Sequence, residues 1–118
     1  MGNDDNKYLA EKLLEPFKVT APVHIRVPRV RKGAKRCYEL AGKFILEHPE
    51  ARIVHGTVNG NIPHAWVEID GLVYDGTCKG LFEHGGYYAV MDAKPVQVFG
   101  HQEFCEKLAD SPVWGPLS

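Results

Sequence analysis

Two runs of alternating apolar and polar residues in the middle of the chain predict a β-hairpin. They lie within Ile62–Thr77, which reads IPHAWVEIDGLVYDGT, on either side of Asp70-Gly71. Asp-Gly favours a type I′ turn, because both central residues of that turn have a positive φ. A two-residue turn here fixes the register of the hairpin, with Val67 directly opposite Tyr74.

This register places a histidine and an aspartate on the same face of the hairpin. Because side chains alternate along a strand, one face is apolar and carries Ala65, Val67, Ile69, Leu72 and Tyr74. The other face carries His64, Trp66, Glu68, Val73, Asp75 and Thr77. His64 and Asp75 are diagonal neighbours, whose Cα atoms lie roughly 7–8 Å apart, within reach of an imidazole and a carboxylate. The pattern therefore predicts a His64–Asp75 pair.

The periodicity of the remaining chain predicts helices near both ends and further strands around the hairpin. The expected helices are Asn3–Phe17, about Ala34–His48 and Gly100–Asp110. The expected strands are Arg52–Val58, Tyr87–Met91 and Val96–Phe99, with a short edge strand or an extended segment within Lys18–Val30 and residues 78–86 as a loop. We expect a single α+β domain over residues 1–118, in which an antiparallel sheet of four or five strands packs on the second helix.

A cysteine near the start of that second helix is the candidate partner of the histidine. Cys37 shares an apolar stripe with Leu40, Ala41, Phe44 and Ile45, which turns it toward the rest of the protein. A purely structural cysteine would occupy the same position, because free cysteine is among the most buried residue types. The His64–Asp75 pair is what favours a chemical role for Cys37.

The order of Cys37, His64-Ala65-Trp66 and Asp75-Gly76-Thr77 resembles the transglutaminase-like branch of the papain-like cysteine enzyme superfamily. In that family a Cys begins a helix, H-A-W lies on a strand, and an Asp, often within D-P-T, closes the next strand. The downstream Y-Y-A-V and W-G-P-L are similar to small bacterial and phage proteins of this type. The resemblance implies a papain/transglutaminase-like core. It also implies a thiol-dependent acyl hydrolase or acyl transferase acting on a peptide or amide bond.

The chemistry assigns a role to each residue of this set. Cys37 would attack an acyl carbon, because a helix N-terminus and an imidazole both favour the thiolate. His64 would carry the proton and Asp75 would orient the imidazole. The Cys37 backbone N–H is a natural oxyanion donor. Weaker substrate-binding candidates are Trp66, for which packing is the favoured role, and Asn61, which also suits a turn. No cofactor is expected.

Composition limits the classes of partner. The 118 residues are 44% hydrophobic and 25% charged, with a net charge of −1, so bulk electrostatics predict neither nucleic-acid nor membrane binding. Three widely spaced cysteines leave at least one thiol unpaired, which favours a reducing cytoplasm. The first residues lack the basic and apolar regions of a signal peptide. We expect a protein or peptide substrate.

Three other interpretations remain open at this stage. A basic run between Arg26 and Arg36 is either a solvated surface or a contact surface. In the second case it would bind an anionic substrate, or a host protein if the chain were a non-catalytic, phage-type interaction module. A metal site built from Cys37, His64 and Cys78 is less favoured, because structural zinc ligands are usually closely paired. A nucleic-acid binder ranks last, since no reading motif is present.

Overall fold

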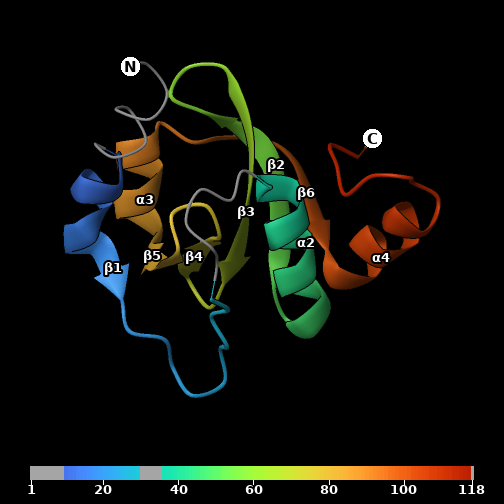
Figure 1. Cartoon of the computed structure of the whole chain (residues 1–118), viewed down its shortest axis with the longest axis horizontal. Coiled ribbons are helices and arrows are strands. Elements are labelled where there is room, and N and C mark those ends of the chain that lie inside the picture. The colour runs from blue at the N-terminus through green and yellow to red at the C-terminus, as the bar shows by residue number, and fades with distance from the viewer. Residues whose placement is uncertain (1–9, 30–35, 118) are drawn as a thin grey trace.

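A six-stranded antiparallel sheet forms the centre of the computed structural model, which describes residues 10–29 and 36–117 (Figure 1). Its strands are β1 (Lys18–Val19), β2 (Arg52–Val58), β3 (Ile62–Ile69), β4 (Leu72–Asp75), β5 (Gly80–Glu83) and β6 (Lys94–Gly100). They lie side by side in the order β1-β5-β4-β3-β2-β6. The helices are residues 10–14, the short 3-10 helix η1 (Glu15–Phe17), α2 (Cys37–Glu47), α3 (His84–Met91) and α4 (His101–Ala109). The predicted α+β class and antiparallel sheet are confirmed.

The predicted hairpin forms with the expected turn and register. Asp70 and Gly71 have φ values of 50° and 76°, which is the pair of positive angles that a type I′ turn requires. Val67 pairs with Tyr74 across β3 and β4, as predicted. The local chemistry of two turn residues therefore sets which side chains of the two strands share a face.

The sheet is buried on both faces, so the expectation of one apolar and one polar face is wrong. Neighbouring residues of one strand enter different cores. Ala65 and Tyr74 belong to the core beneath α2, while Trp66 and Val73 belong to the core beneath α3. Figure 1 shows α3 and residues 10–17 on one side of the sheet and α2 and α4 on the other. The residues predicted to form a polar face lie largely under α3.

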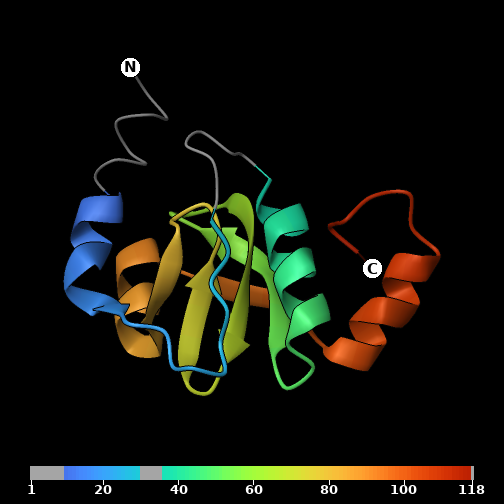
Figure 2. The same cartoon turned by 60° about the horizontal axis from the view of Figure 1, so that its bottom comes forward.

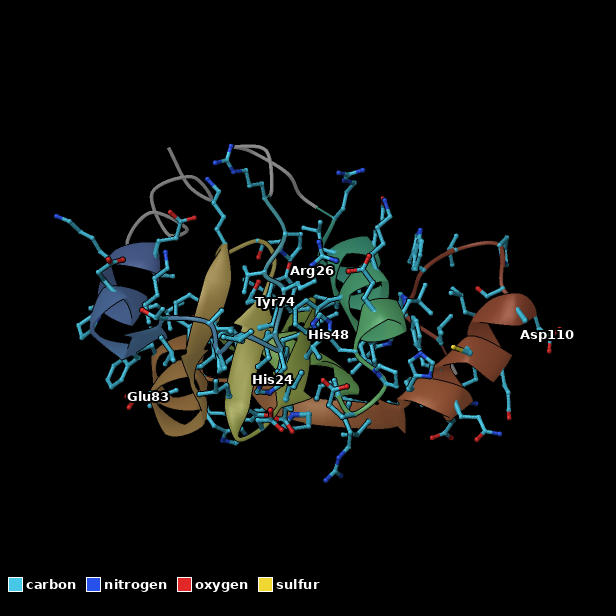
Figure 3. All side chains as sticks on the ribbon, turned by 90° about the horizontal axis from the view of Figure 1, so that it is seen from below. His24, Arg26, His48, Tyr74, Glu83 and Asp110 are labelled. Atoms are coloured by element: carbon cyan, nitrogen blue, oxygen red, sulfur yellow. The ribbon has the colours of Figure 1, made fainter. Side chains whose placement is uncertain are left out.

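The face under α2 is also covered by an extended segment, residues 20–29, which runs along the strands beside that helix (Figure 2). Ile25 is buried in the core on this face. The Arg26 backbone N–H donates to His48 Nε2 at 3.2 Å, and the other ring nitrogen bonds the Phe44 carbonyl at 2.9 Å. Figure 3 shows His24, Arg26 and His48 grouped on this face, with Tyr74 beside them. Through these two hydrogen bonds, His48 links residues 20–29 to the end of α2.

The C-terminal residues that the structure describes pack tightly against α2 and against His55 of β2. A Cβ on Gly42 would lie 2.5 Å from the Trp114 ring, and a Cβ on Gly115 would lie 2.7 Å from Tyr38 and 2.9 Å from His55. Burial lowers the pKa of His55 to about 4. The neutral ring can therefore accept the Leu117 N–H, whose nitrogen lies 3.4 Å from Nδ1. The tail thus lies against the residue that follows Cys37.

Several predicted elements need correction. The sheet has six strands among the described residues rather than four or five, and β5 forms where a loop was expected. The predicted strand at Tyr87–Met91 is wrong, since these residues belong to the helix α3. Its two buried residues, Tyr87 and Met91, are four apart, as on one face of a helix. The segment predicted as a short edge strand or an extended segment, Lys18–Val30, contains the edge strand β1, and residues 20–29 after it form neither helix nor strand. Residues 1–9 and 34–35 of the predicted helices lie outside the described residues.

A bulge where β2 meets β6 makes a glycine necessary at position 56. The pairing shifts between His55 and Gly56, and a Cβ on Gly56 would lie 2.1 Å from the Lys94 carbonyl oxygen. The contact is with backbone, which cannot rotate away as a side chain can. Any larger residue would push the two strands apart.

We expect Gly56→Ala to lower the free energy of unfolding by about 2 kcal/mol or more, which is the scale of overpacking in a core. Urea unfolding measures it. The matched control is Gly85→Ala in α3, where nothing lies within 4 Å of the added Cβ. That substitution should be neutral or stabilise slightly, because alanine is the better helix former. Equal effects of the two changes would contradict the steric argument.

Candidate functional site

Cys37 is the first residue of α2, as the sequence predicts. The amide N–H groups of the first helical turn have no partner within the helix, and they give this end a partial positive charge. The residue is half-buried and packs against the core on its face of the sheet. The thiol is therefore held by the fold at a helix end that favours anions.

His64 and Asp75 form the hydrogen bond that the hairpin register predicts. His64 lies near the start of β3 and Asp75 is the last residue of β4, so both lie at one end of the hairpin. His64 Nε2 is 2.8 Å from Asp75 Oδ2. His64 is 9% exposed and Asp75 is fully buried. Asp70 instead lies in the turn, where its Oδ2 is 2.5 Å from His24 Nε2.

The thiol and the carboxylate act on the imidazole together. Burial of the ring opposes protonation, but the charge and hydrogen bond of Asp75, followed by a hydrogen bond with Cys37, raise the pKa of His64. Because Nε2 is engaged by Asp75, Nδ1 is the ring nitrogen that remains for the thiol. The structure thus brings Cys37, His64 and Asp75 together in the order sulfur, imidazole, carboxylate.

The Asp75 carboxylate receives five hydrogen bonds. Oδ1 accepts from the Thr77 backbone N–H at 2.9 Å, the Thr77 hydroxyl at 2.8 Å and the Cys78 backbone N–H at 3.2 Å. Oδ2 accepts from the Tyr87 hydroxyl at 2.5 Å and from His64. Burial would raise the pKa of Asp75, but His64, Tyr87 and Thr77 outweigh burial and hold it well below its usual range. Asp75 therefore stays ionised although no part of it is exposed.

The sequence analysis predicts only the His64 donor and misses those of Thr77, Cys78 and Tyr87. Asp75-Gly76-Thr77 has the pattern of a turn in which an Asp side chain accepts from the backbone two residues later, so Thr77 had a recognisable local signal. Tyr87 had none, because its position depends on how α3 packs on the sheet. Burial, and then Asp75, raises the pKa of Tyr87 well above its usual value, so the hydroxyl keeps its proton and donates it.

The other two thiols lie in different surroundings. Burial, and then the charge of Asp75, raises the pKa of Cys78 well above its usual value. Cys105 was expected in the core but is only half-buried, and its sulfur lies 3.9 and 4.0 Å from the two ring nitrogens of His101 on α4. Within residues 10–29 and 36–117, no three His, Cys, Asp or Glu side chains cluster as metal ligands do, including the set Cys37, His64 and Cys78.

The two weaker substrate-binding candidates differ in accessibility. Trp66 is fully buried, and its Nε1 donates to the Tyr88 hydroxyl at 3.2 Å. These contacts agree with the favoured packing role, and the buried side chain offers no exposed surface to a substrate in this structure. Asn61 is exposed in the turn between β2 and β3. It lies three residues before His64, and nothing else tests its role.

Part of the basic run lies within the described residues. Arg26, Arg29 and Arg36 are exposed, and Arg36 contacts Glu39 at 3.2 Å on the first turn of α2. The run's remaining cations, Arg31, Lys32 and Lys35, lie outside the described residues. Arg29 and Arg36 thus lie in the sequence on either side of residues 30–35, just before Cys37.

Comparison of the chain with models of protein families, with curated proteins and with solved structures finds no match. In the part of the chain that the structure describes, no helix has both the length and the apolarity needed to cross a bilayer.

We expect iodoacetamide at neutral pH to label Cys37 at least about tenfold faster than Cys78, because alkylation requires an accessible thiolate. Cys37 has an imidazole beside it, whereas desolvation and the charge of Asp75 raise the pKa of the Cys78 thiol well above its usual value. Peptide mapping by mass spectrometry gives the rate at each site. Faster labelling of Cys78 or Cys105 would contradict the assignment of Cys37 as the reactive thiol.

We expect the stability that Asp75 contributes to be largest between about pH 4 and pH 6.5. The pKa of Asp75 is depressed, so its contribution is present above the unfolded value of about 3.9 and is lost as pH falls. The pKa of His64 is raised to about 10. Its contribution is therefore complete below about pH 6.5 and is lost as pH rises toward the folded value.

Urea unfolding of the wild type and Asp75→Asn across this range measures the effect. The difference between their free energies of unfolding should shrink toward both acid and alkaline pH. Asp70→Asn, at an exposed aspartate, is the matched control and should show no such maximum. A difference that stays constant with pH would show that Asp75 and His64 are not coupled.

Proposed function

We propose that this protein is a thiol-dependent acyl hydrolase or acyl transferase that acts on a peptide or amide bond. The observation that carries the proposal is the 2.8 Å contact between His64 and a fully buried, ionised Asp75, with Cys37 beside the ring at a helix N-terminus. A buried charged pair is costly unless other bonds satisfy it. Such pairs cluster at functional sites, where they tune a reactive group.

In the first half of the reaction, Cys37 attacks the acyl carbon. With the thiol proton already held by His64, the thiolate sulfur forms a bond to the carbon, and the carbon–nitrogen bond breaks. His64 then delivers the proton to the departing amine. Asp75 keeps the ring in one orientation and stabilises its charged form. The Cys37 backbone N–H is placed to donate to the oxyanion of the tetrahedral intermediate.

The acceptor decides the product of the second half. Water, deprotonated by His64, attacks the thioester carbon, and the released thiol recovers the proton. This path gives a carboxylic acid, as in a protease, amidase or deamidase. A primary amine attacking the same carbon gives a new amide, as in a transglutaminase. Both outcomes use the same three side chains, so the proposal covers both.

The order of elements is consistent with the papain/transglutaminase-like core that the motifs resemble. A helix that begins with the Cys precedes a strand that carries the His, and the next strand ends with the Asp. The sheet around them is antiparallel. The phage-type interaction module would use the same fold without turnover, and its contact surface would include the exposed Arg26, Arg29 and Arg36.

Activity-based profiling separates these two functions. The protein is treated with electrophilic peptide, glutamine-amide and ubiquitin-like acyl probes, and the wild type is compared with Cys37→Ala. Labelling that requires Cys37, together with turnover of the matching amide substrate, supports the enzyme. A folded wild type that forms no adduct with any probe would favour the interaction module.

We expect Asp75→Asn to reduce turnover of whichever amide substrate is accepted by roughly 10²- to 10⁴-fold, because the amide would hold the wrong imidazole tautomer. Asp70→Asn should change turnover by less than about twofold, since Asn-Gly makes the same turn. Steady-state kinetics are measured with thermal unfolding of each variant, so that loss of fold is not mistaken for loss of chemistry. A comparable loss in both variants would overturn the assignment of Asp75.

A further inference from the structure

Two consecutive tyrosines of α3 each donate a hydrogen bond to a different carboxylate of the sheet. The Tyr87 hydroxyl donates to Asp75 Oδ2 at 2.5 Å, and the Tyr88 hydroxyl donates to Glu68 Oε2. Tyr87 is fully buried. Glu68 also bonds the exposed His84 at 3.0 Å and is not part of the Cys37 site. The helix therefore presents one hydroxyl to the candidate site and a neighbouring one elsewhere.

Tyr87 and His64 share a single oxygen of Asp75. Three donors from Thr77 and Cys78 already hold Oδ1 and fix the plane of the carboxylate. Tyr87 is therefore not needed to orient Asp75. Its hydroxyl instead withdraws negative charge from Oδ2, the oxygen that faces the imidazole. A hydrogen bond to a charged acceptor is stronger than one between neutral groups, so this withdrawal is appreciable.

We propose that Tyr87 is a positioning residue of this site, acting through Asp75 to weaken the hold of the carboxylate on the imidazolium so that His64 can release its proton to a leaving group. This inference rests on the proposed function, because only acyl transfer from an amide requires that release. A buried carboxylate without Tyr87 would stabilise the imidazolium more strongly, since the interior screens charge poorly. The imidazolium would then be a poorer general acid.

The titratable groups around the pair come from four places. Cys37 from α2 faces the His64 ring, and Tyr74, Cys78 and Tyr87 face Asp75 from β4, the following loop and α3. Burial raises the pKa of all three groups that face Asp75, so they stay neutral at neutral pH. Of these three, Tyr87 donates to Oδ2, the oxygen shared with His64.

The test compares Tyr87→Phe with the matched control Tyr88→Phe, which removes an identical hydroxyl from the next residue. NMR titration of the His64 ring gives its pKa without requiring any activity. In Tyr87→Phe we expect this pKa to rise by about one unit, the scale of one hydrogen bond to a charged group. In Tyr88→Phe it should not move. No change in either variant would overturn the proposal.

The rates of Cys37 alkylation and of amine release then distinguish a positioning role of Tyr87 from a purely structural one. Alkylation of Cys37 by iodoacetamide needs the thiolate but no proton delivery, whereas release of an amine from a fluorogenic glutamine amide needs both. Tyr87→Phe should keep the alkylation rate within about twofold and slow amine release by about tenfold, the equivalent of one pKa unit. Parallel losses of both rates would indicate a structural role and overturn the proposal.

The outcome for Tyr87 is separable from the outcome for the proposed function. If the wild type releases no amine, the proposed function fails, while the NMR titration still decides whether Tyr87 acts on His64. If Tyr87→Phe unfolds, incorporation of 3-fluorotyrosine at position 87 keeps the hydroxyl and makes it a stronger donor. The His64 pKa should then fall. A rise or no change would count against the proposal.

Discussion

The structure depends on keeping one carboxylate ionised in a place that water does not reach. Transfer of a lone carboxylate into a protein interior is prohibitively unfavourable unless other groups replace its hydration. Around Asp75 that replacement comes from the neighbouring strand β3, the loop after β4 and the helix α3, and each contributes at least one donor. The hairpin, the turn after β4 and the position of α3 are therefore parts of one arrangement. A change in any of them leaves a buried charge incompletely satisfied.

How far the sequence predicts this site depends on how local each signal is. The hairpin register follows from the two turn residues, so the His64–Asp75 bond could be predicted from residues adjacent in the chain. The position of Cys37 at a helix start follows from helical periodicity. Tyr87 could not be found in this way, because Tyr-Tyr-Ala-Val-Met suits a strand as well as a helix. Only the packing of α3 on the sheet decides between them.

The missed strand β5 has a similar cause. It has four residues, too few for alternation to stand out from a loop. Gly85-Gly86 reads as a break, yet a Cβ on Gly86 would lie 2.2 Å from the Phe17 ring. That glycine lets α3 approach the preceding 3-10 helix η1 closely. Glycine is required at position 86 because of Phe17, which lies roughly seventy residues earlier in the chain. The residues next to Gly86 in the sequence therefore do not reveal this requirement.

Because the tail that packs on α2 is synthesised last, the candidate site is complete in sequence before it is fully supported in structure. Every side chain of the candidate site, from Cys37 to Tyr87, leaves the ribosome before Trp114, Gly115 and Leu117, which complete the wall beside Tyr38 and over His55. Domains generally fold as units once their sequence is available. The nascent chain would thus carry all the reactive groups while the helix that bears the thiol still lacks one of its supports. During translation, the reactive side chains would therefore be available before the tail packs against α2 and supports Cys37.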